Sequence, residues 1–421
     1  MTAESNWAGN FTYAAGQVLH PRTVGELQDL VAGASQVKAL GSRHCFTDIA
    51  DSPGGVQIDP SGIEVPVEID ADAATVTVAG AARYGDFAET LHAAGFALPN
   101  LASLPHCTVA GSVATATHGS GSGLRSLASA VSAVELVTAD GELRTFSRDP
   151  GLVVGLGAFG VVTRMTLDLV PAFDVRVDVF DALPWAVAFD DFDSIMDSAY
   201  SVSMFTNWVG DAVDQVWLKT RLPGEAPRGF PGAVPADGPR HPAHAAGVSA
   251  ENCTEQLGVP GPWYERIPHF KLAFTPSVGN EIQSEYFVPR RFAVGALEAV
   301  RSLGPQLAPV LLVSEVRTVA GDELWLSPFH GGDRVALHFT WRPDQPGVEA
   351  VLPALEEALA PFGARPHWGK LFHGAALDLQ YPKLPEFREL ASRLDPDGKF
   401  RNPFLLRYAL SPSWRRSGVS K

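Results

Sequence analysis

The chain has 421 residues, 46% of them hydrophobic and 19% charged, which excludes a disordered protein and suits about two or three packed domains. Its 47 acidic and 32 basic residues give a net charge of −15, so nucleic acid is excluded as a partner because its phosphates would be repelled. Three cysteines are too few for a disulfide scaffold, and no apolar run of ~18 residues predicts a membrane span. The N-terminus lacks the regions of a signal peptide, so we expect a cytoplasmic protein with no membrane partner.

The first 172 residues predict an α+β domain in which short strands and helices alternate. A helical period is present at residues 23–37 and 84–94, and extended runs occur at 56–58, 75–79, 130–138 and 161–169. Residues 105–123 are rich in Gly, Ser, Thr and His and follow neither period. The Val-Pro step at 170–171 marks the expected end of this domain.

Residues 173–385 predict a second domain of sheet and helices, followed by a C-terminal segment at 386–421. A loop rich in Pro and Gly covers residues 222–247. Strand signals follow at 271–275, 282–288, 310–319 and 334–341, with helical periods at 291–303 and 348–359. No internal repeat is present.

Several catalytic motifs can be set aside. A GxGxxG pattern at residues 155–160 has Asp178 and Asp181 at the distance that a dinucleotide fold requires, but the residues after it alternate like a strand and should open no helix. The sequence has no GxxxxGKS/T, HExxH, paired CxxC or GxSxG motif. A P-loop, a zinc site and a hydrolase nucleophile elbow are therefore not expected, and no metal is predicted.

Two segments of the first domain suit a large cofactor. In Leu40-Gly-Ser-Arg-His-Cys-Phe46 a strand ends in a Gly-Ser turn whose amides can cradle a pyrophosphate, although a solvated turn explains the spacing equally well. In residues 103–123 the small side chains let the backbone approach a flat or phosphorylated ligand closely. A flexible linker would have these glycines without the Thr, His and Val between them.

Polar residues share a face on two predicted strands of the second domain. Glu315 and Arg317 are two residues apart, as are His338 and Thr340, so each pair projects from one side of its strand. Positions 335, 337, 339 and 341 on the other side are apolar. This pattern favours a polar-lined cavity over a half-exposed sheet with a surface ion pair. The segment Pro366-His-Trp-Gly-Lys370 can bring a further His and a cation to the same place.

Seven motifs occur in order over nearly the whole chain: Asn6-Trp-Ala-Gly-Asn-Phe-Thr-Tyr13, Gly-Ser-Arg-His44, Leu-Pro-His-Cys-Thr-Val-Ala-Gly111, Gly-Ala-Phe-Gly-Val-Val-Thr163, Glu315-Val-Arg317, Pro-His-Trp-Gly-Lys370 and Leu-Asp-Pro-Asp-Gly-Lys-Phe400. In these motifs the sequence resembles the vanillyl-alcohol-oxidase-type flavoproteins, and more closely the alditol oxidases, near relatives of the sugar-lactone oxidases. The resemblance implies an FAD-binding domain, a substrate domain with a mainly antiparallel sheet covered by helices, and a C-terminal segment that packs back on the FAD-binding domain.

By that resemblance the first domain binds FAD, and His44 is bonded covalently to the flavin 8α-methyl group. The other residues implied at the cofactor are Ala39, Leu40, Gly41, Ser42, Arg43, Cys45, Ser103, Thr108, Gly111, Ser112, Val113, Ala114, His118, Val161, Val162 and His367. Cys45 departs from the Ser that relatives often carry after the histidine. Cys107 is one residue away from the position at which some relatives attach the flavin a second time, so a single tether is expected.

The resemblance also implies the reaction and its residues. A terminal primary hydroxyl of a linear polyol such as xylitol or sorbitol is oxidised to the aldose, and O2 is reduced to H2O2. Arg317 and Lys370 would stabilise the developing alkoxide, and either His338 or Lys370 would take the proton. The residues implied to hold substrate hydroxyls are Ser103, Glu315, Arg317, Thr340 and Lys370.

Alternative functions remain open at this point. A sugar-lactone oxidase or dehydrogenase would share every motif, and Ala102 beside Ser103 could guard the oxygen access that separates an oxidase from a dehydrogenase. A non-catalytic flavin- or sugar-binding module is the alternative of another class, and the retained Glu315, Arg317 and Lys370 argue against it. Because the family is often monomeric, we expect a monomer.

Overall fold

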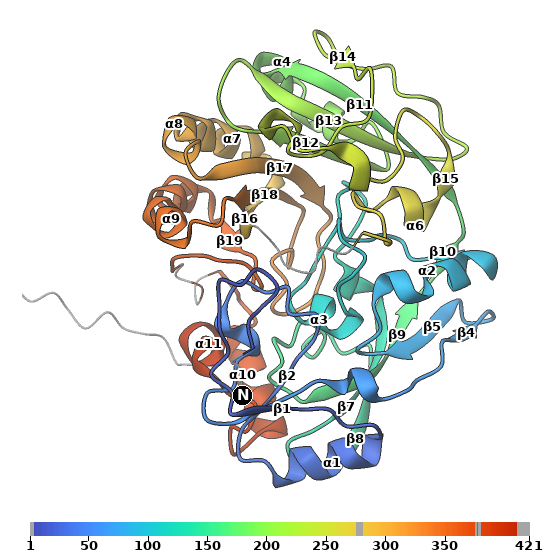
Figure 1. The fold of residues 1–421 in the computed structure, drawn as a ribbon, viewed down its shortest axis with the longest axis vertical. Helices are drawn as coiled ribbons and strands as arrows, with labels where there is room; N and C mark the ends of the chain where they lie inside the picture. The colour runs from blue at the N-terminus through green and yellow to red at the C-terminus, as the bar shows by residue number, and fades with distance from the viewer. Residues whose placement is uncertain (1–3, 275–280, 375–376, 378–379, 411–421) are drawn as a thin grey trace, which may run out of the picture.

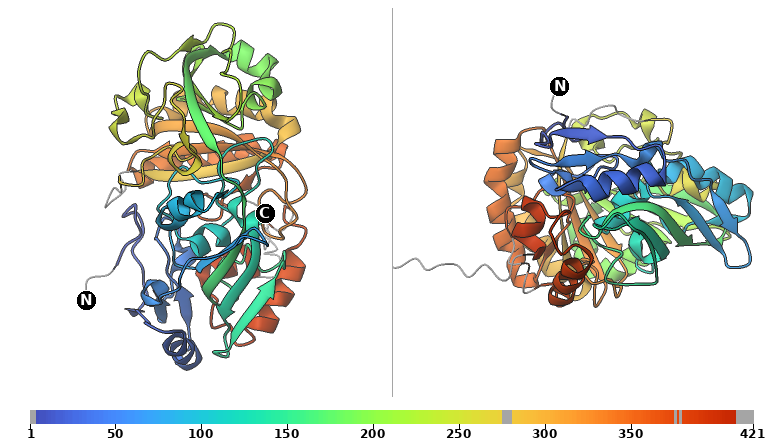
Figure 2. Two further views of the ribbon diagram at one scale, coloured as in Figure 1. Left: turned by 90° about the vertical axis from the view of Figure 1, so that its right-hand side faces the viewer. Right: turned by 90° about the horizontal axis from the view of Figure 1, so that it is seen from below.

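The computed structural model describes residues 4–274, 281–374, 377 and 380–410. The N-terminal part of the chain (blue to cyan) and the C-terminal helices (red) form a lower body, and the central part (green to orange) forms an upper body (Figure 1). The same two bodies are seen from the side and from below in Figure 2. The chain therefore leaves the lower body once and returns to it at the end.

The lower body contains two main sheets, a short two-stranded pair and five helices. The parallel sheet has the order β1-β3-β2 (Gln17–Leu19, Val56–Ile58, Val37–Ala39). The antiparallel sheet has the order β4-β5-β9-β7-β8 (Glu68–Asp70, Thr75–Ala79, Val161–Asp168, Val131–Val137, Leu143–Ser147). The pair is β6 with β10 (Phe96–Ala97, Val170–Pro171), and the helices are α1, α2, α3, α10 and α11 (Val24–Gly33, Tyr84–Ala93, Val109–Ala114, Leu384–Leu394, Pro403–Leu405).

Local sequence explains where these elements begin and which side they bury. The Thr23 side chain accepts a hydrogen bond from the amide of Glu26 at 3.1 Å and so caps α1. In β9, apolar and polar residues alternate, and burial alternates with them. In α10 the buried positions recur every three to four residues, which turns one stripe of the helix to the core.

The upper body is built on one antiparallel sheet of nine strands. Its order is β14-β11-β13-β12-β17-β18-β16-β19, with β15 paired to β11 (Val234–Pro235, Asp174–Pro184, Ala212–Arg221, Ser201–Thr206, Leu311–Val319, Arg334–Trp341, Ile282–Pro289, Arg365–Pro366; β15 Gly261–Pro262). Its helices are α4, α5, α6, α7, α8 and α9 (Trp185–Asp190, Phe192–Met196, Trp263–Arg266, Ala293–Ser302, Gly304–Leu307, Gln345–Leu359).

The two faces of this sheet have different partners. Leu337, Phe339 and Trp341 of β18 are fully buried. The helices α7 and α9 lie along one face of this sheet (Figure 1). Tyr286 of β16 lies on the same face and donates to Glu356 of α9 at 2.8 Å. The alternate side chains of β16, β17 and β18 face the lower body, so the sheet itself divides apolar packing from a polar surface.

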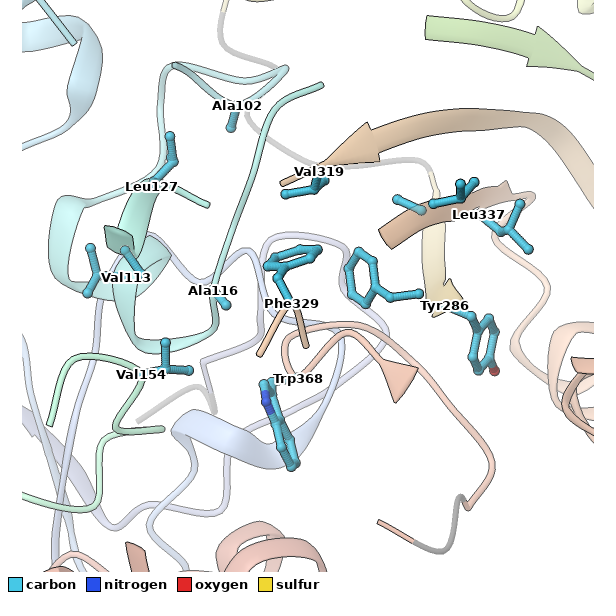
Figure 3. Packing of buried hydrophobic residues seen from close by; sticks show 14 of the residues in the cluster. Ala102, Val113, Ala116, Leu127, Val154, Tyr286, Val319, Phe329, Leu337 and Trp368 are labelled. Carbon is cyan, nitrogen blue, oxygen red and sulfur yellow. The ribbon is translucent and has the colours of Figure 1, made fainter. Parts of the chain in front are cut away.

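Apolar packing is continuous between the two bodies. Figure 3 shows Phe329 of the upper body next to Ala116 of the lower body, with Val319 and Trp368 nearby. All four side chains belong to one large buried cluster. The bodies therefore share one core.

The observed elements agree with most of the expected ones and correct others. The strands and helices expected at 23–37, 56–58, 75–79, 84–94, 130–138, 161–169, 282–288, 310–319, 334–341 and 348–359 are present, within one to four residues at most ends. The helix expected at 291–303 is α7, preceded by a 3-10 turn at Arg290–Phe292. The strand expected at 271–275 is wrong, because its described residues form a turn. The strands β11, β12 and β13 were not predicted, and neither was the short helix α3 in the segment 105–123.

The C-terminal segment returns to the lower body in the part that the structure describes, up to residue 410. The amide of Val37 in β2 donates to the carbonyl of Lys399 at 2.9 Å, and Gln36 donates to the carbonyl of Arg401 at 2.9 Å. The last eleven residues of the expected segment lie outside the described residues. No helix in the described ranges combines the length and apolar character needed to cross a membrane.

Candidate active site

A cavity of about 700 Å³ lies between the lower body and the polar face of the upper sheet. Loops of the lower body line one side, and β16, β17 and β18 line the other. The cavity brings together most of the residues expected at the site. These are Ala39, Leu40, Gly41, Ser42, Arg43, His44, Cys45, Ser103, Thr108, Gly111, Ser112, Ala114, His118, Val162, Glu315, Arg317, His338, Thr340, His367 and Lys370.

The loop after β2 presents a row of free backbone amides to this cavity. Among the described residues, no protein acceptor takes a hydrogen bond from the amides of residues 41–45. Arg43 has φ 61°, a left-handed conformation that turns successive amides toward one side. A Cβ on Gly41 would lie 2.7 Å from Oγ1 of Thr108, so only glycine fits there. This loop has the features of an anion-binding nest.

His44 belongs to the same loop and lines the cavity. Its ring stacks on Trp7 with centroids 4.9 Å apart, and its Nδ1 donates to the carbonyl of Ser42 at 2.9 Å. Burial lowers the pKa of His44 to about 4, so the imidazole is neutral at pH 7. A neutral ring keeps one nitrogen lone pair, which a bond to an electrophilic carbon requires.

A second loop, residues 155–160, lines the cavity and precedes β9. The GxGxxG pattern thus opens a strand, as expected, and Leu156, Gly157 and Gly160 have positive φ. Lys38, which also lines the cavity, lies 2.9 Å from the carbonyl of Gly157 and fixes this loop against β2. Val162, just after this loop and also lining the cavity, was expected at the site from the sequence; the loop itself was not.

Strand register places charged side chains in one row across the upper sheet. His338 of β18 pairs with Glu285 of β16 on one side and with Glu315 of β17 on the other. Two residues further along β17, on the same face, Arg317 pairs with Ala336. Thr340 lies two residues after His338 on the same face of β18, opposite Gln283 of β16. The polar face expected from the sequence is therefore present, and it lines the cavity.

Arg317 lies between two buried carboxylates. Its Nη2 donates to Glu285, and its Nε lies 3.5 Å from Oε2 of Glu315. Burial would raise the pKa of each carboxyl, but the Arg317 cation lowers the pKa of both Glu285 and Glu315 far below their ordinary range, assisted by Lys370 at Glu285 and by His269 at Glu315. Both carboxylates are therefore ionised hydrogen-bond acceptors.

Lys370 and His338 form a hydrogen-bonded pair beside them. Lys370 Nζ lies 2.7 Å from Nδ1 of His338 and 2.7 Å from Oε2 of Glu285. His338 Nε2 lies 3.1 Å from Oγ1 of Thr340. Burial and the Lys370 cation lower the pKa of His338 to about 4, and burial lowers the pKa of Lys370 against the opposing charge of Glu285.

Two expected cofactor residues do not reach the cavity with their side chains. Val113 and Val161 are fully buried in apolar clusters of the lower body. Glu285, by contrast, lines the cavity at the centre of the charge cluster and was not singled out from the sequence. Its signal was that it is the single charged residue in the expected strand at 282–288. His269 was missed as well, because it lies in a segment without a period.

The described residues fit FAD and offer no metal site. The unpaired amides of residues 41–45 suit a pyrophosphate, and the buried hydroxyls of Thr108 and Ser112 have no protein partner. Thr108 and Ser112 line the cavity, so a ligand there can satisfy them. No group of three or more His, Cys, Asp or Glu side chains among the described residues is arranged to hold a metal.

Comparisons with known proteins agree with this fold and site. The chain matches the model of an FAD binding domain over residues 15–147 and that of D-arabinono-1,4-lactone oxidase over residues 277–408. These matches and the cavity define an FAD-dependent oxidoreductase. An alditol oxidase of Streptomyces sp. is 51% identical, over 96% of this chain and 98% of the relative. An L-gulono-1,4-lactone dehydrogenase of Mycobacterium tuberculosis is 30% identical over the same shares. The chain belongs to the family of the alditol oxidases and their sugar-lactone oxidase relatives.

Solved structures support the same fold. The cholesterol oxidase of B. sterolicum superimposes with a TM-score of 0.78 over 97% of this chain and 96% of that one, at 16% identity. At this identity the likeness concerns the fold alone. The two-domain vanillyl-alcohol-oxidase-type architecture expected from the sequence is thereby confirmed.

Proposed function

We propose that this protein oxidises a terminal primary hydroxyl of a linear polyol such as xylitol or sorbitol to the aldose. The observation that carries this proposal is the row of ionised and hydrogen-bonding side chains on the upper sheet, which faces the flavin-binding loops across one cavity. A polyol offers a hydroxyl on every carbon, and this row offers matching acceptors and donors. The similarity to an alditol oxidase supports the same substrate class.

FAD is the cofactor that the lower body suits. We propose that the loop at 39–45 holds the pyrophosphate and that His44 carries the flavin through a covalent bond. The neutral imidazole and its fixed orientation on Trp7 support that bond. When bound, FAD supplies the two-electron acceptor for the oxidation and passes the electrons to O2, which leaves as hydrogen peroxide.

The chain's own residues bind and polarise the substrate. Glu315 accepts a hydrogen bond from one hydroxyl, and Thr340 and Ser103 hold others. Arg317 and Lys370 place positive charge where the alkoxide develops, in a site with little water to screen it. Glu285 stabilises both cations in this position by its ion pairs with them.

The hydroxyl proton goes to the Lys370–His338 pair in this proposal. The substrate O–H bond breaks, and the pair gains one proton. Burial lowers the pKa of both members, which makes the neutral, proton-accepting form of Lys370 easier to reach, and Lys370 is the cation beside the alkoxide once it holds the proton. Thr340 Oγ1 is 3.1 Å from His338 Nε2, so a hydroxyl held by Thr340 is next to the imidazole.

The first test is the visible spectrum of the purified protein before and after acid precipitation. Yellow colour in the pellet supports the covalent bond, and His44→Ala should move the colour to the supernatant. Colour released from the wild-type protein contradicts the bond and leaves the FAD site intact. A colourless protein that does not rebind FAD contradicts the proposal as a whole.

The second test is a substrate screen with peroxide detection. We expect the highest kcat/KM with xylitol or sorbitol, and peroxide in proportion to product. Higher kcat/KM with L-gulono-1,4-lactone would assign the protein to the lactone-oxidising branch. Dye reduction without peroxide would indicate a dehydrogenase, and a flavin that no polyol or lactone reduces would indicate a non-catalytic module.

We also propose that the enzyme acts as a cytoplasmic monomer, as its family is often monomeric. Light scattering on the purified protein tests the monomer, since a mass of about twice 44.8 kDa would contradict it. Cell fractionation tests the location, since recovery outside the cytoplasmic fraction would contradict it.

A further inference from the structure

Two buried side chains behind Glu315 form a chain of hydrogen bonds that ends on its carboxylate. Lys219 lies on β13, and His269 lies in the segment that follows α6. Lys219 Nζ is 2.8 Å from Nδ1 of His269, and His269 Nε2 is 2.8 Å from Oε1 of Glu315. The exposed fractions of Lys219, His269 and Glu315 are only 1%, 5% and 5%, so water does not compete for these bonds.

The chemistry of Lys219 sets the tautomer of His269. The ammonium form of Lys219 can only donate and the ionised Glu315 can only accept, so Nδ1 of the imidazole accepts and its single ring proton is on Nε2. That Nε2–H donates to Glu315. Lys219 also donates to the carbonyl of Ile267, two residues before His269, which fixes the position of its nitrogen.

Aromatic rings hold the imidazole in this orientation. The His269 ring lies 5.6 Å from the Phe205 ring and 5.3 Å from the Trp217 ring, measured between centroids. Burial, with the nearby Lys219 cation, lowers the pKa of His269 to about 4, so the ring is neutral at pH 7. These rings restrict the orientation of the imidazole, so that its two nitrogens keep facing Lys219 and Glu315.

His269 also connects the two bodies at the substrate end of the cavity. Its backbone amide donates to the carbonyl of Ser103 at 3.0 Å, while its side chain holds Glu315. Ser103 and Glu315 both line the cavity and are both expected to bind substrate hydroxyls. One residue therefore sets the spacing between a contact in the lower body and a contact in the upper body.

We propose that Lys219 and His269 are positioning residues for polyol binding at Glu315. Lys219 fixes the Nε2–H tautomer of His269, and this N–H donates to Oε1 of Glu315. The other carboxylate oxygen, Oε2, lies 3.5 Å from Arg317 Nε and accepts a hydrogen bond from a substrate hydroxyl. This inference rests on the proposed function. Because the hydroxyl is held in the ground state and the transition state alike, losing the pair should raise KM more than it lowers kcat.

The kinetic test uses Lys219→Met, with Lys271→Met as the matched control. Lys271 lies two residues from His269, and its Nζ donates to the carbonyl of Glu251 away from the cavity. We expect Lys219→Met to raise KM for the best polyol about tenfold with kcat within about twofold, the effect of one charge-assisted hydrogen bond. The control should match the wild type. An unchanged KM in Lys219→Met would overturn the inference.

A pair of His269 variants separates positioning from packing and does not depend on whether Lys219→Met folds. The Gln side chain places a donor near Nε2, and the Asn side chain places it near Nδ1. His269→Gln should therefore retain KM within about threefold, whereas His269→Asn should raise it about tenfold. In the His269→Gln background, Lys219→Met should add no further effect. Equal losses in both variants, or additive losses in the double variant, would overturn the inference.

A spectroscopic readout is independent of turnover. In the ¹⁵N-histidine spectrum of the holoenzyme, His269 should show a protonated Nε2 and an unprotonated Nδ1, and Lys219→Met should shift it toward a mixture of tautomers. A spectrum unchanged by Lys219→Met would contradict the pairing. A wild-type enzyme that oxidises no polyol or lactone would overturn the proposed function, and this spectrum would still decide the role of Lys219.

Discussion

One guanidinium separates two buried carboxylates at the centre of the cavity. Replacing Arg317 by Ala would leave Glu285 and Glu315 facing each other without their shared cation, which should cost about 3–5 kcal/mol of unfolding free energy. Arg317→Lys keeps the charge and loses the two-sided geometry, so it should retain most of the stability while kcat/KM falls about 100-fold. Urea unfolding and steady-state kinetics on both variants measure the two effects. Wild-type kcat/KM in Arg317→Lys would contradict the role of Arg317.

Buried neutral histidines give the stability a defined pH dependence. The pKa values of His241, His269 and His338 are each lowered to about 4, mainly by burial. Between pH 6.5 and 5 the unfolded chain binds protons that the folded chain does not, so stability is present above pH 6.5 and is lost as the pH falls, by up to ~1.4 kcal/mol per pH unit for each group.

We therefore expect the urea midpoint to fall steadily from pH 7 to pH 5. His241→Gln removes one of these three groups and should make this slope shallower. The His241 ring accepts a bond from the amide of Ala243 and packs against Phe270, outside the charge cluster, so its loss leaves that cluster intact. A flat profile over this range, or an unchanged slope in the variant, would show that these histidines are not held neutral.

Most individual site residues were predictable from the sequence because they sit in local motifs. Gly41 to His44, and Glu315 with Arg317, lie in short segments whose spacing is compatible with a site, and the family resemblance supplies their expected roles. Glu285 was not, because its role depends on cross-strand register: it meets His338 only when β16 pairs with β18. Lys219 and His269 are 50 residues apart in sequence, and no local pattern connects them.

At the scale of elements, the loop after β2 depends on a close approach to Thr108. In Gly41→Ala the new Cβ would lie 2.7 Å from Thr108 Oγ1, so the loop must move and its amides lose their common direction. We expect a loss of about 1–3 kcal/mol in stability and a lower ratio of flavin to protein absorbance. Adding Thr108→Ala removes the clash and should restore part of the flavin. Full flavin content in Gly41→Ala would contradict the role of this loop.

Periodicity in the sequence determines neither the partners of a strand nor the presence of a very short helix. Residues 174–180 alternate polar and apolar residues as a strand should, but the neighbours of β11 are remote in sequence and only the folded sheet reveals them. The segment 271–275 has an apolar run at 272–274 that is also typical of a strand, yet its described part forms a turn. The helix α3 is only six residues long, too short for a 3.6-residue period to emerge.

At the scale of the whole molecule, the shared core predicts cooperative unfolding. Side chains from both bodies belong to one buried cluster, and the cavity between them is completed by both. Heating should therefore give coincident transitions in far-ultraviolet circular dichroism and in flavin fluorescence. Two separated transitions would show that the bodies are independent units.

The return of the chain end to the lower body has a consequence for synthesis. β2 is bonded to Lys399, and the buried Lys38 lies 3.4 Å from the carbonyl of Phe400. His367 and Lys370 complete the cavity from the same late part of the chain. When the first half of the polypeptide has been synthesised, the cavity-lining loops of the lower body between residues 39 and 162 are already present. The segment 399–401, which binds to β2, is still missing. We therefore expect the flavin to be acquired only after residues 399–401 have been synthesised and can dock on β2.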